Sequence, residues 1–154
     1  MSMPQPGDAA PAFTLEGDAG PISLADFAGR KLVVYFYPKD DTPGCTTEGK
    51  AFSALKPQFD AAETAVVGIS RDSVAAHAKF RKKHALTVAL GSDEGAVTEA
   101  FGVWVEKSMY GKKYMGIERA TFLIDRAGKV ARVWPKVKVP GHAEEVLAAA
   151  QALA

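Results

Sequence analysis

The sequence predicts an α/β fold in three layers, with a sheet between two layers of helices and a β-hairpin at the N-terminus. Two short apolar runs, residues 32–37 and 65–70, are rich in β-branched and aromatic side chains. Such runs are typical of strands buried on both faces in a largely parallel sheet. Each run is followed by a helix-start signal, Thr42-Pro43 after the first and Asp72-Ser73 after the second. This strand–helix alternation indicates a sheet flanked by helices.

Local patterns predict the other elements. Alternation at residues 13–15 and 22–24, around a glycine-containing turn, predicts the N-terminal hairpin. The remaining expected elements are a helical turn at 25–28, a helix from Ser73 to about His84, a strand at 87–90, a short helix at 95–101, a weak strand at 103–109, a hairpin of strands 120–124 and 130–134, and a helix at 143–153. This is the order expected of the thioredoxin-like fold, a three-layer α/β/α sandwich.

The helix that starts at Pro43 has an apolar face for the sheet, because Phe52, Leu55 and Phe59 keep helical spacing. Pro57 falls inside this pattern. Since proline lacks the N–H that the helix ladder needs, we expect a break or kink just before it.

Length and composition limit the possible functions. The 154 residues fit a single domain, residues 1–154, without repeats or linkers. The net charge of +1 argues against a dedicated binder of nucleic acid or of anionic membranes. The N-terminus has no signal-peptide pattern, and no apolar run is long enough to span a bilayer, so a cytoplasmic location is expected.

Cys45 is the only cysteine and falls in the first turn of the helix that starts at Pro43. There the free backbone N–H groups and the helix dipole favour a thiolate over a thiol. A lone cysteine is otherwise most often an inert buried side chain. The polar, turn-forming residues 40–44 make a poor wall for a hydrophobic core, and ligands of open α/β sheets bind at this position. We therefore interpret Cys45 as a reactive cysteine.

Other side chains give weaker signals. The three histidines, His77, His84 and His142, lack ligand-like spacing with each other or with Cys45, so no metal site is expected. For His77 a surface or capping role is favoured over that of a general base. The aromatic residues Trp104, Tyr110 and Tyr114 fit either a substrate or partner surface or the core.

The segment Tyr37–Glu48, YPKDDTPGCTTE, resembles the active-site signature of the peroxiredoxins, in particular the bacterioferritin-comigratory-protein or PrxQ group. The resemblance covers nearly the whole chain. Its further segments are Gly68–Ser73 with His77, Lys79 and Phe80, then Ser92–Asp93, Phe101–Val103, Gly116–Asp125 and Val137–His142. It implies the thioredoxin-like fold and reduction of hydrogen peroxide and organic hydroperoxides without metal or bound cofactor.

The resemblance also implies roles for five residues. Cys45 would be the attacking sulfur, Thr42 would orient the peroxide, and Pro38 would shield the sulfur from bulk water. Arg119 would favour the thiolate and bind the substrate oxygens, and Glu48 would hold the Arg119 guanidinium. Each of the last four also has a purely structural reading: helix cap, strand stop, solvated edge residue and partner of the helix dipole, respectively.

Many relatives carry a resolving cysteine five residues after the reactive one, where this chain has Lys50. A single cysteine predicts that an external thiol, from thioredoxin or from glutathione with glutaredoxin, attacks the Cys45 sulfenic acid. The chain is expected to be a monomer or a weak homodimer. Two alternatives are a redox-sensing or chaperone-like interaction protein switched by oxidation of Cys45, and a cysteine hydrolase, which needs a histidine base near the sulfur.

Overall fold

The computed structural model describes residues 2–154 of the chain. Three parallel strands form its centre: β3 (Lys31–Phe36), β4 (Thr64–Ser70) and β5 (Ala89–Ser92). They are connected by α1 (Pro43–Ala61) and α2 (Val74–His84). The remaining elements are β1 (Thr14–Gly17), β2 (Ile22–Ser23), the 3-10 helix η1 (Leu24–Phe27), α3 (Ala96–Ala100), β6 (Trp104–Met109), β7 (Lys112–Ile117), β8 (Ala120–Ile124), β9 (Val130–Trp134) and α4 (His142–Ala152).

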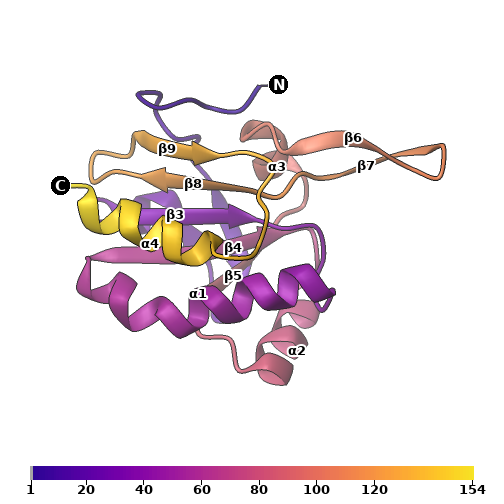
Figure 1. The fold of residues 1–154 in the computed structure, drawn as a ribbon, viewed down its shortest axis with the longest axis horizontal. Coiled ribbons are helices and arrows are strands. Elements are labelled where there is room, and N and C mark those ends of the chain that lie inside the picture. Colours follow the sequence, from indigo (N-terminus) through magenta and orange to yellow (C-terminus); the bar gives the residue numbers. More distant parts are fainter. Residues whose placement is uncertain (1) are drawn as a thin grey trace.

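Within residues 2–154, seven of the strands form one mixed sheet in the order β2-β1-β5-β4-β3-β8-β9 (Figure 1). The parallel centre is extended on both sides by antiparallel strands, β1 and β2 next to β5 and β8 and β9 next to β3. Both predicted hairpins are present. The predicted α/β class is therefore confirmed. The two apolar runs lie in β3 and β4, except that Tyr37 falls just beyond the end of β3.

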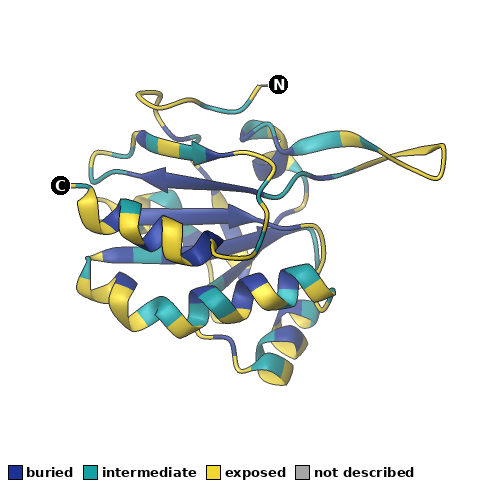
Figure 2. Cartoon of the chain, viewed as in Figure 1, coloured by how far each residue is buried: buried dark blue, intermediate teal, exposed yellow. Residues whose placement is uncertain are grey.

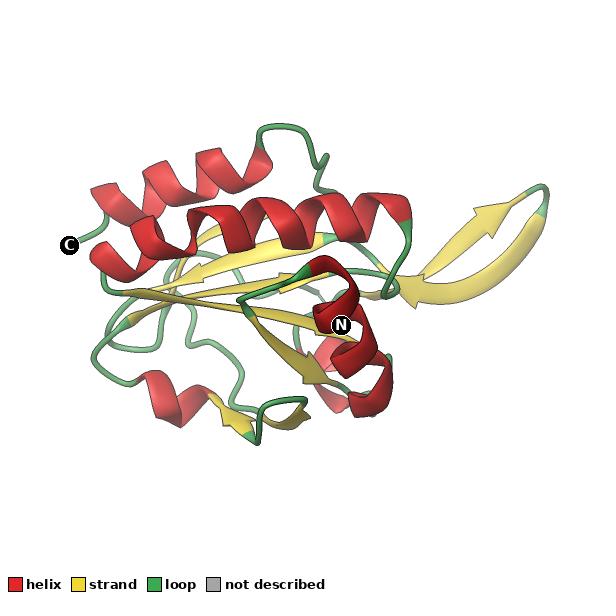
Figure 3. Ribbon diagram, turned by 90° about the horizontal axis from the view of Figure 1, so that it is seen from below, coloured by secondary structure: helices red, strands yellow, loops and turns green. Residues whose placement is uncertain are grey.

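Helices cover both faces of this sheet (Figure 3). On one face α1, α2 and α4 bury Phe52, Phe80 and Val146 against the strands. On the other face α3 and the N-terminal hairpin bury Phe101 and Phe13. Figure 2 shows the central strands buried between these layers. Because β3, β4 and β5 are parallel, their carboxyl ends meet at one edge of the sheet, where α1 and α2 begin.

The helix α1 continues through Pro57 to Ala61, so of the break or kink expected at Pro57 the break does not occur. Proline cannot donate to the carbonyl four residues earlier, which belongs to Ser53. That carbonyl accepts instead from Thr87 Oγ1 at 3.3 Å, and Ser53 Oγ accepts from the Thr87 N–H at 2.9 Å. The segment before β5 thus satisfies the group that the proline leaves free, and the helix continues.

The strand β5 starts and ends two residues later than the expected strand at 87–90. The guanidinium of Arg81 in α2 explains this shift, because it donates to the carbonyl oxygens of Leu86 at 2.8 Å and Val88 at 2.7 Å. The Thr87 N–H is bonded to Ser53. These backbone groups bind side chains and are not available to a neighbouring strand.

The strands β6 and β7 form a separate antiparallel pair that projects from the body as an arm (Figure 1). The weak strand expected at 103–109 is confirmed as β6, whereas β7 was not predicted. Tyr110 at the tip is 98% exposed and Tyr114 is 44% exposed, so the core reading is wrong for both. Trp104 at the base is half-buried with the Arg71 guanidinium over its ring. No helix in residues 2–154 is long and apolar enough to cross a membrane.

Candidate active site

Cys45 lies at the start of α1, just beyond the carboxyl end of β3. Thr42 is the N-cap with an extended backbone, Pro43 is the first helical residue and Cys45 is the third, as expected. Cys45 is 2% exposed. The sulfur is therefore placed where the unpaired N–H groups and the dipole of the helix favour negative charge.

The Arg119 side chain joins Cys45 to Glu48. Its Nη2 donates to Cys45 Sγ at 3.3 Å, and its Nη1 donates to Glu48 Oε1 at 2.6 Å. Glu48 follows Cys45 by three residues in α1, so both side chains project from one face of the helix. The structure thus brings together three of the residues that the sequence singled out, across 74 residues of chain.

Strand register explains how Arg119 reaches the sulfur. β8 is antiparallel to β3 with Ala120 paired to Phe36, so the residue before Ala120 lies at the carboxyl end of β3. The backbone there is held by a hydrogen bond from the Val137 N–H to the Arg119 carbonyl oxygen at 2.9 Å. Arg119 is therefore positioned by the sheet, whereas Cys45 and Glu48 are positioned by the helix.

Glu48 is a buried carboxyl group, 1% exposed. Burial raises the pKa of Glu48 to about 7, against the opposing effect of the Arg119 charge and hydrogen bond. Among the described residues its Oε2 has no hydrogen-bond partner, and neither has the hydroxyl of the nearby buried Tyr35. Burial by itself lowers the pKa of Arg119, but the interactions with Glu48 and Cys45 are together stronger, and the net effect is a raised pKa.

The hydroxyl of Thr42 does not cap the helix. It donates to the carbonyl oxygen of Lys39 at 2.8 Å and not to the sulfur, and it accepts no bond from the Cys45 N–H. Thr42 thus has the N-cap position, but its side chain does not make the hydrogen bond of a helix cap. Its oxygen lone pairs therefore remain available to an incoming O–H group. Pro38 stands two residues after the end of β3, consistent with a strand stop, and is exposed.

Lys107 of β6 is a nearby cation that the sequence reading did not single out. Its Nζ donates to the carbonyl oxygen of Ile117, two residues before Arg119. Burial and the Arg119 charge lower its pKa, while Glu118 and Cys45 act in the opposite direction. A prediction of the β6–β7 hairpin from the sequence would have indicated that Lys107 lies near the start of β8. The sequence of β7 does not predict a strand, because most of its side chains are exposed and lack an apolar alternation.

Each histidine of the chain is bonded away from the sulfur. His77 is fully buried against Asp40 and the Gly91 carbonyl, so the surface or capping role favoured for it is wrong. His84 contacts Asp41, and His142 Nε2 lies 2.8 Å from Thr121 Oγ1. In residues 2–154 no group of three or more histidine, cysteine or acidic side chains is arranged to hold a metal ion.

Comparison with known proteins agrees with this geometry. The AhpC/TSA family matches residues 6–133. A putative peroxiredoxin bcp of Coxiella burnetii is 52% identical over 143 residues, which cover 92% of this chain and 95% of that protein. This chain is a peroxiredoxin of the AhpC/TSA family. The Peroxiredoxin Bcp of Bacillus subtilis is 47% identical over 143 residues, covering 92% of this peroxiredoxin and 91% of that protein.

The fold of this peroxiredoxin matches a solved structure of Xanthomonas campestris Peroxiredoxin Q with a TM-score of 0.88. The two share 48% sequence identity over 97% of this chain and 96% of that one. The thioredoxin-like fold implied by the active-site resemblance is confirmed. As a member of this family the protein is a thiol-dependent peroxidase, which acts on peroxides and takes electrons from a thiol reductant, and it has one cysteine.

Proposed function

We propose that this peroxiredoxin reduces hydrogen peroxide and small organic hydroperoxides by direct attack of the Cys45 thiolate on the O–O bond. The observation that carries the proposal is the bond from Arg119 Nη2 to Cys45 Sγ in the first turn of α1. The sulfur takes one oxygen and becomes a sulfenic acid. The O–O bond breaks, and the departing oxygen takes a proton to leave as water or alcohol.

The surrounding residues have complementary roles in this proposal. Arg119 stabilises the thiolate and then the negative charge on the departing oxygen. Glu48 holds the guanidinium through Nη1, which leaves Nη2 directed at the sulfur. Thr42 accepts the O–H of the peroxide because its own hydrogen is directed to Lys39. Pro38 limits access of water to the sulfur.

An external thiol completes the cycle, because Cys45 is the only sulfhydryl of the chain. The thiol attacks the sulfenic acid, releases water and forms a mixed disulfide with Cys45. A second thiol then reduces that disulfide and regenerates Cys45. Thioredoxin, or glutathione with glutaredoxin, are the proposed donors. The cytoplasmic location and the monomeric or weakly dimeric state stay predictions.

Organic hydroperoxides are included because a similar protein acts on them. Structures of the bacterioferritin comigratory protein of Xanthomonas campestris, 47% identical to this chain, are described in terms of its alkyl peroxide reduction activity. For this chain the ratio of rate constants with hydrogen peroxide and with an alkyl hydroperoxide tests that part of the proposal.

The deciding experiment mixes the reduced protein rapidly with one equivalent of hydrogen peroxide. Tryptophan emission follows the reaction, and intact mass with a sulfenic-acid trap identifies the product. We expect a fast reaction that adds one oxygen to Cys45, and no turnover in Cys45→Ser. An unreacted thiol after minutes contradicts the peroxidatic role. A Cys45–Cys45 disulfide between two chains as the main turnover species contradicts resolution by an external thiol.

A redox-dependent interaction protein is the second candidate function. The observation that favours it is the projecting β6–β7 arm, with Met109, Tyr110, Tyr114 and Met115 exposed. Rapid oxidation of Cys45 combined with slow turnover by every thiol donor would support this role over the peroxidase cycle. A cysteine hydrolase has no such support, since the histidines are bonded elsewhere.

A further inference from the structure

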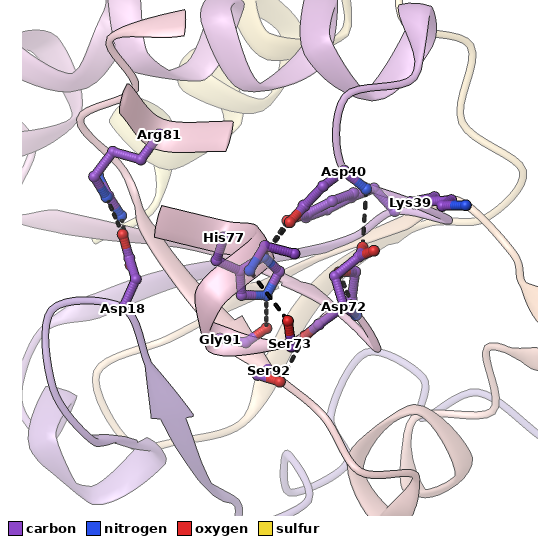
Figure 4. Close-up of polar contacts among 12 residues, drawn as sticks. Asp18, Lys39, Asp40, Asp72, Ser73, His77, Arg81, Gly91 and Ser92 are labelled. Carbon is purple, nitrogen blue, oxygen red and sulfur yellow. Dashed lines mark hydrogen bonds and ion pairs between the residues drawn. The ribbon is translucent and has the colours of Figure 1, made fainter. Parts of the chain in front are cut away.

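A buried polar cluster lies between the segment after β3 and the helix α2 (Figure 4). Its centre is His77, which is 0% exposed. His77 Nδ1 lies 2.6 Å from Asp40 Oδ2, and Nε2 lies 2.9 Å from the carbonyl oxygen of Gly91. The other oxygen of Asp40 accepts from the Tyr37 hydroxyl at 2.6 Å.

The partners of His77 determine its protonation state. A carbonyl oxygen only accepts hydrogen bonds, so Nε2 carries a hydrogen. Asp40 already receives the Tyr37 hydrogen on one oxygen, and its second oxygen faces Nδ1. An imidazolium that donates from both nitrogens satisfies the carbonyl and the carboxylate together. Without the second hydrogen, the Nδ1 lone pair would face a carboxylate oxygen, and the contact would become repulsive.

The groups that surround His77 favour this charged form. The titratable groups facing it are Asp40 and Tyr37 on the segment after β3 and Asp72 after β4, while β5 contributes the Gly91 carbonyl. Burial by itself lowers the pKa of His77, but the hydrogen bond and charge of Asp40, then Gly91 and Asp72, raise it above its ordinary value. Burial also raises the pKa of Tyr37 well above its ordinary value, so its hydroxyl stays a donor.

Asp40 connects His77 to the active site through the backbone. Its N–H donates to Asp72 Oδ2 at 2.8 Å, and it stands two residues before Thr42, the N-cap of α1. The next residue, Asp41, has a left-handed backbone with φ of 61°, which only a well-supported segment maintains at low cost. The contacts of Asp41 with Lys83 and His84 are exposed and contribute little support. The buried His77 contact is therefore the main side-chain attachment of this segment to α2.

We propose that His77 is a positioning residue for peroxide reduction: its imidazolium holds Asp40, and through residues 40–42 the first turn of α1 that carries Cys45. Loss of the imidazolium proton releases this segment and slows attack by the sulfur. The inference rests on the proposed peroxidatic role of Cys45. A displacement of reacting groups by about 1 Å can cost up to 100-fold in rate, so a second layer of support has a measurable effect.

The test compares pH profiles of Cys45 oxidation by hydrogen peroxide in the wild type, His77→Asn and His77→Leu. The ultraviolet absorbance of the thiolate separates ionisation of the sulfur from that of His77, and an NMR titration of the imidazole gives the midpoint for His77. We expect the wild-type rate constant to fall at alkaline pH with the NMR midpoint. In His77→Asn, which keeps a donor toward Asp40 but does not titrate, the alkaline decrease should disappear. In His77→Leu the rate should be about 10-fold lower throughout.

His84→Asn is the matched control, because it removes the other histidine of the same helix, whose partner Asp41 is exposed, and it should leave the profile unchanged. Lys107, whose pKa is lowered, is a second group able to titrate here, so an alkaline decrease that persists in His77→Asn overturns the proposal. If His77→Leu does not fold, the pH profiles of the wild type and of His77→Asn still test the proposal. A wild-type rate constant that does not change at the NMR midpoint of His77 also overturns the proposal. Failure of wild-type Cys45 to react at any pH would instead contradict the proposed function itself.

Discussion

The absence of a side chain on Gly44 lets the Arg119 guanidinium lie across the start of α1. A Cβ placed on Gly44 would be 3.1 Å from Arg119 Nη2 and 3.8 Å from Cζ. The same Nη2 donates to Cys45 Sγ. The distance between the sulfur and its cationic partner therefore depends on a glycine that local helix rules would not require.

Gly44→Ala should separate activity from stability. The methyl group displaces Nη2 by a few tenths of an ångström, and we expect oxidation of Cys45 to slow several-fold. Alanine is the better helix former by roughly 0.5–1 kcal/mol, so the free energy of unfolding should be equal or higher. Stopped-flow oxidation and urea denaturation measure the two effects. Gly49→Ala is the control, because a Cβ there makes an ordinary 3.4 Å contact with Leu86; an equal loss of rate in both variants would argue against the Arg119 explanation.

Arg119→Ala and Arg119→Lys should both slow oxidation of Cys45, by roughly 100-fold to 1,000-fold for alanine, which is typical of removing one donor to a developing oxyanion. Lysine keeps the charge but cannot donate to Glu48 and the sulfur from a planar fork, so it should restore only part of the rate. Rapid mixing with peroxide measures the rate constant, and thiolate absorbance shows how much of the loss comes from sulfur ionisation. A rate constant in Arg119→Ala equal to that of the wild type would remove Arg119 from the proposed mechanism.

Glu48→Gln should change how stability depends on pH. The pKa of Glu48 is about 7 in the folded protein and near 4.5 when unfolded, so between these values the folded state holds a proton that the unfolded state has lost. The free energy of unfolding of the wild type should therefore fall as pH rises through this window. The pKa of His77 is also raised, so its titration lowers the free energy of unfolding in the same direction as pH rises. This contribution is present in both the wild type and Glu48→Gln.

Glutamine does not titrate. The free energy of unfolding of Glu48→Gln, relative to that of the wild type, should therefore increase by at most about 3 kcal/mol between about pH 4.5 and about pH 7, and should stay constant above that range. Urea denaturation of both proteins across this range measures the difference. Parallel curves would mean that Glu48 titrates at an ordinary pKa.

Two neighbouring buried tyrosines should respond in opposite ways to loss of the hydroxyl. The Tyr35 hydroxyl is buried with no partner in residues 2–154, so Tyr35→Phe should raise the free energy of unfolding by about 1 kcal/mol. The Tyr37 hydroxyl donates to Asp40 at 2.6 Å, so Tyr37→Phe should lower it by about 1–3 kcal/mol. Each variant is the control for the other in thermal or urea denaturation. Equal effects would show that the hydrogen bonds do not determine the difference.

Signals confined to a few neighbouring residues predicted most of the secondary structure. The apolar run of β3, the Thr42-Pro43 start of α1 and the Asp72-Ser73 start of α2 are local signals, and each helix or strand is found where they indicate, with Ser73 as the cap of α2. The hairpin of β8 and β9 is also found within its predicted bounds. Such features depend on the chemistry of adjacent residues, so they do not need knowledge of the fold.

Two of the errors involve partners that are distant in the chain. Continuation of α1 through Pro57 depends on Thr87, and burial of His77 depends on Asp40, 37 residues away. The direction of the Thr42 hydroxyl is set by the shape of the loop that contains Lys39. The exposed strand β7 has no core face to impose an apolar alternation on its sequence.

By itself, the sequence determined that one cysteine would stand in the first turn of a helix after a buried strand, because strand burial and helix capping are local properties. It also carried the motifs that resemble the peroxiredoxins. Only the tertiary structure decided which charges reach the sulfur. The antiparallel register of β8 against β3 sets the position of Arg119, and burial sets the pKa of Glu48. Both depend on long-range packing, in which residues more than 70 positions apart become neighbours.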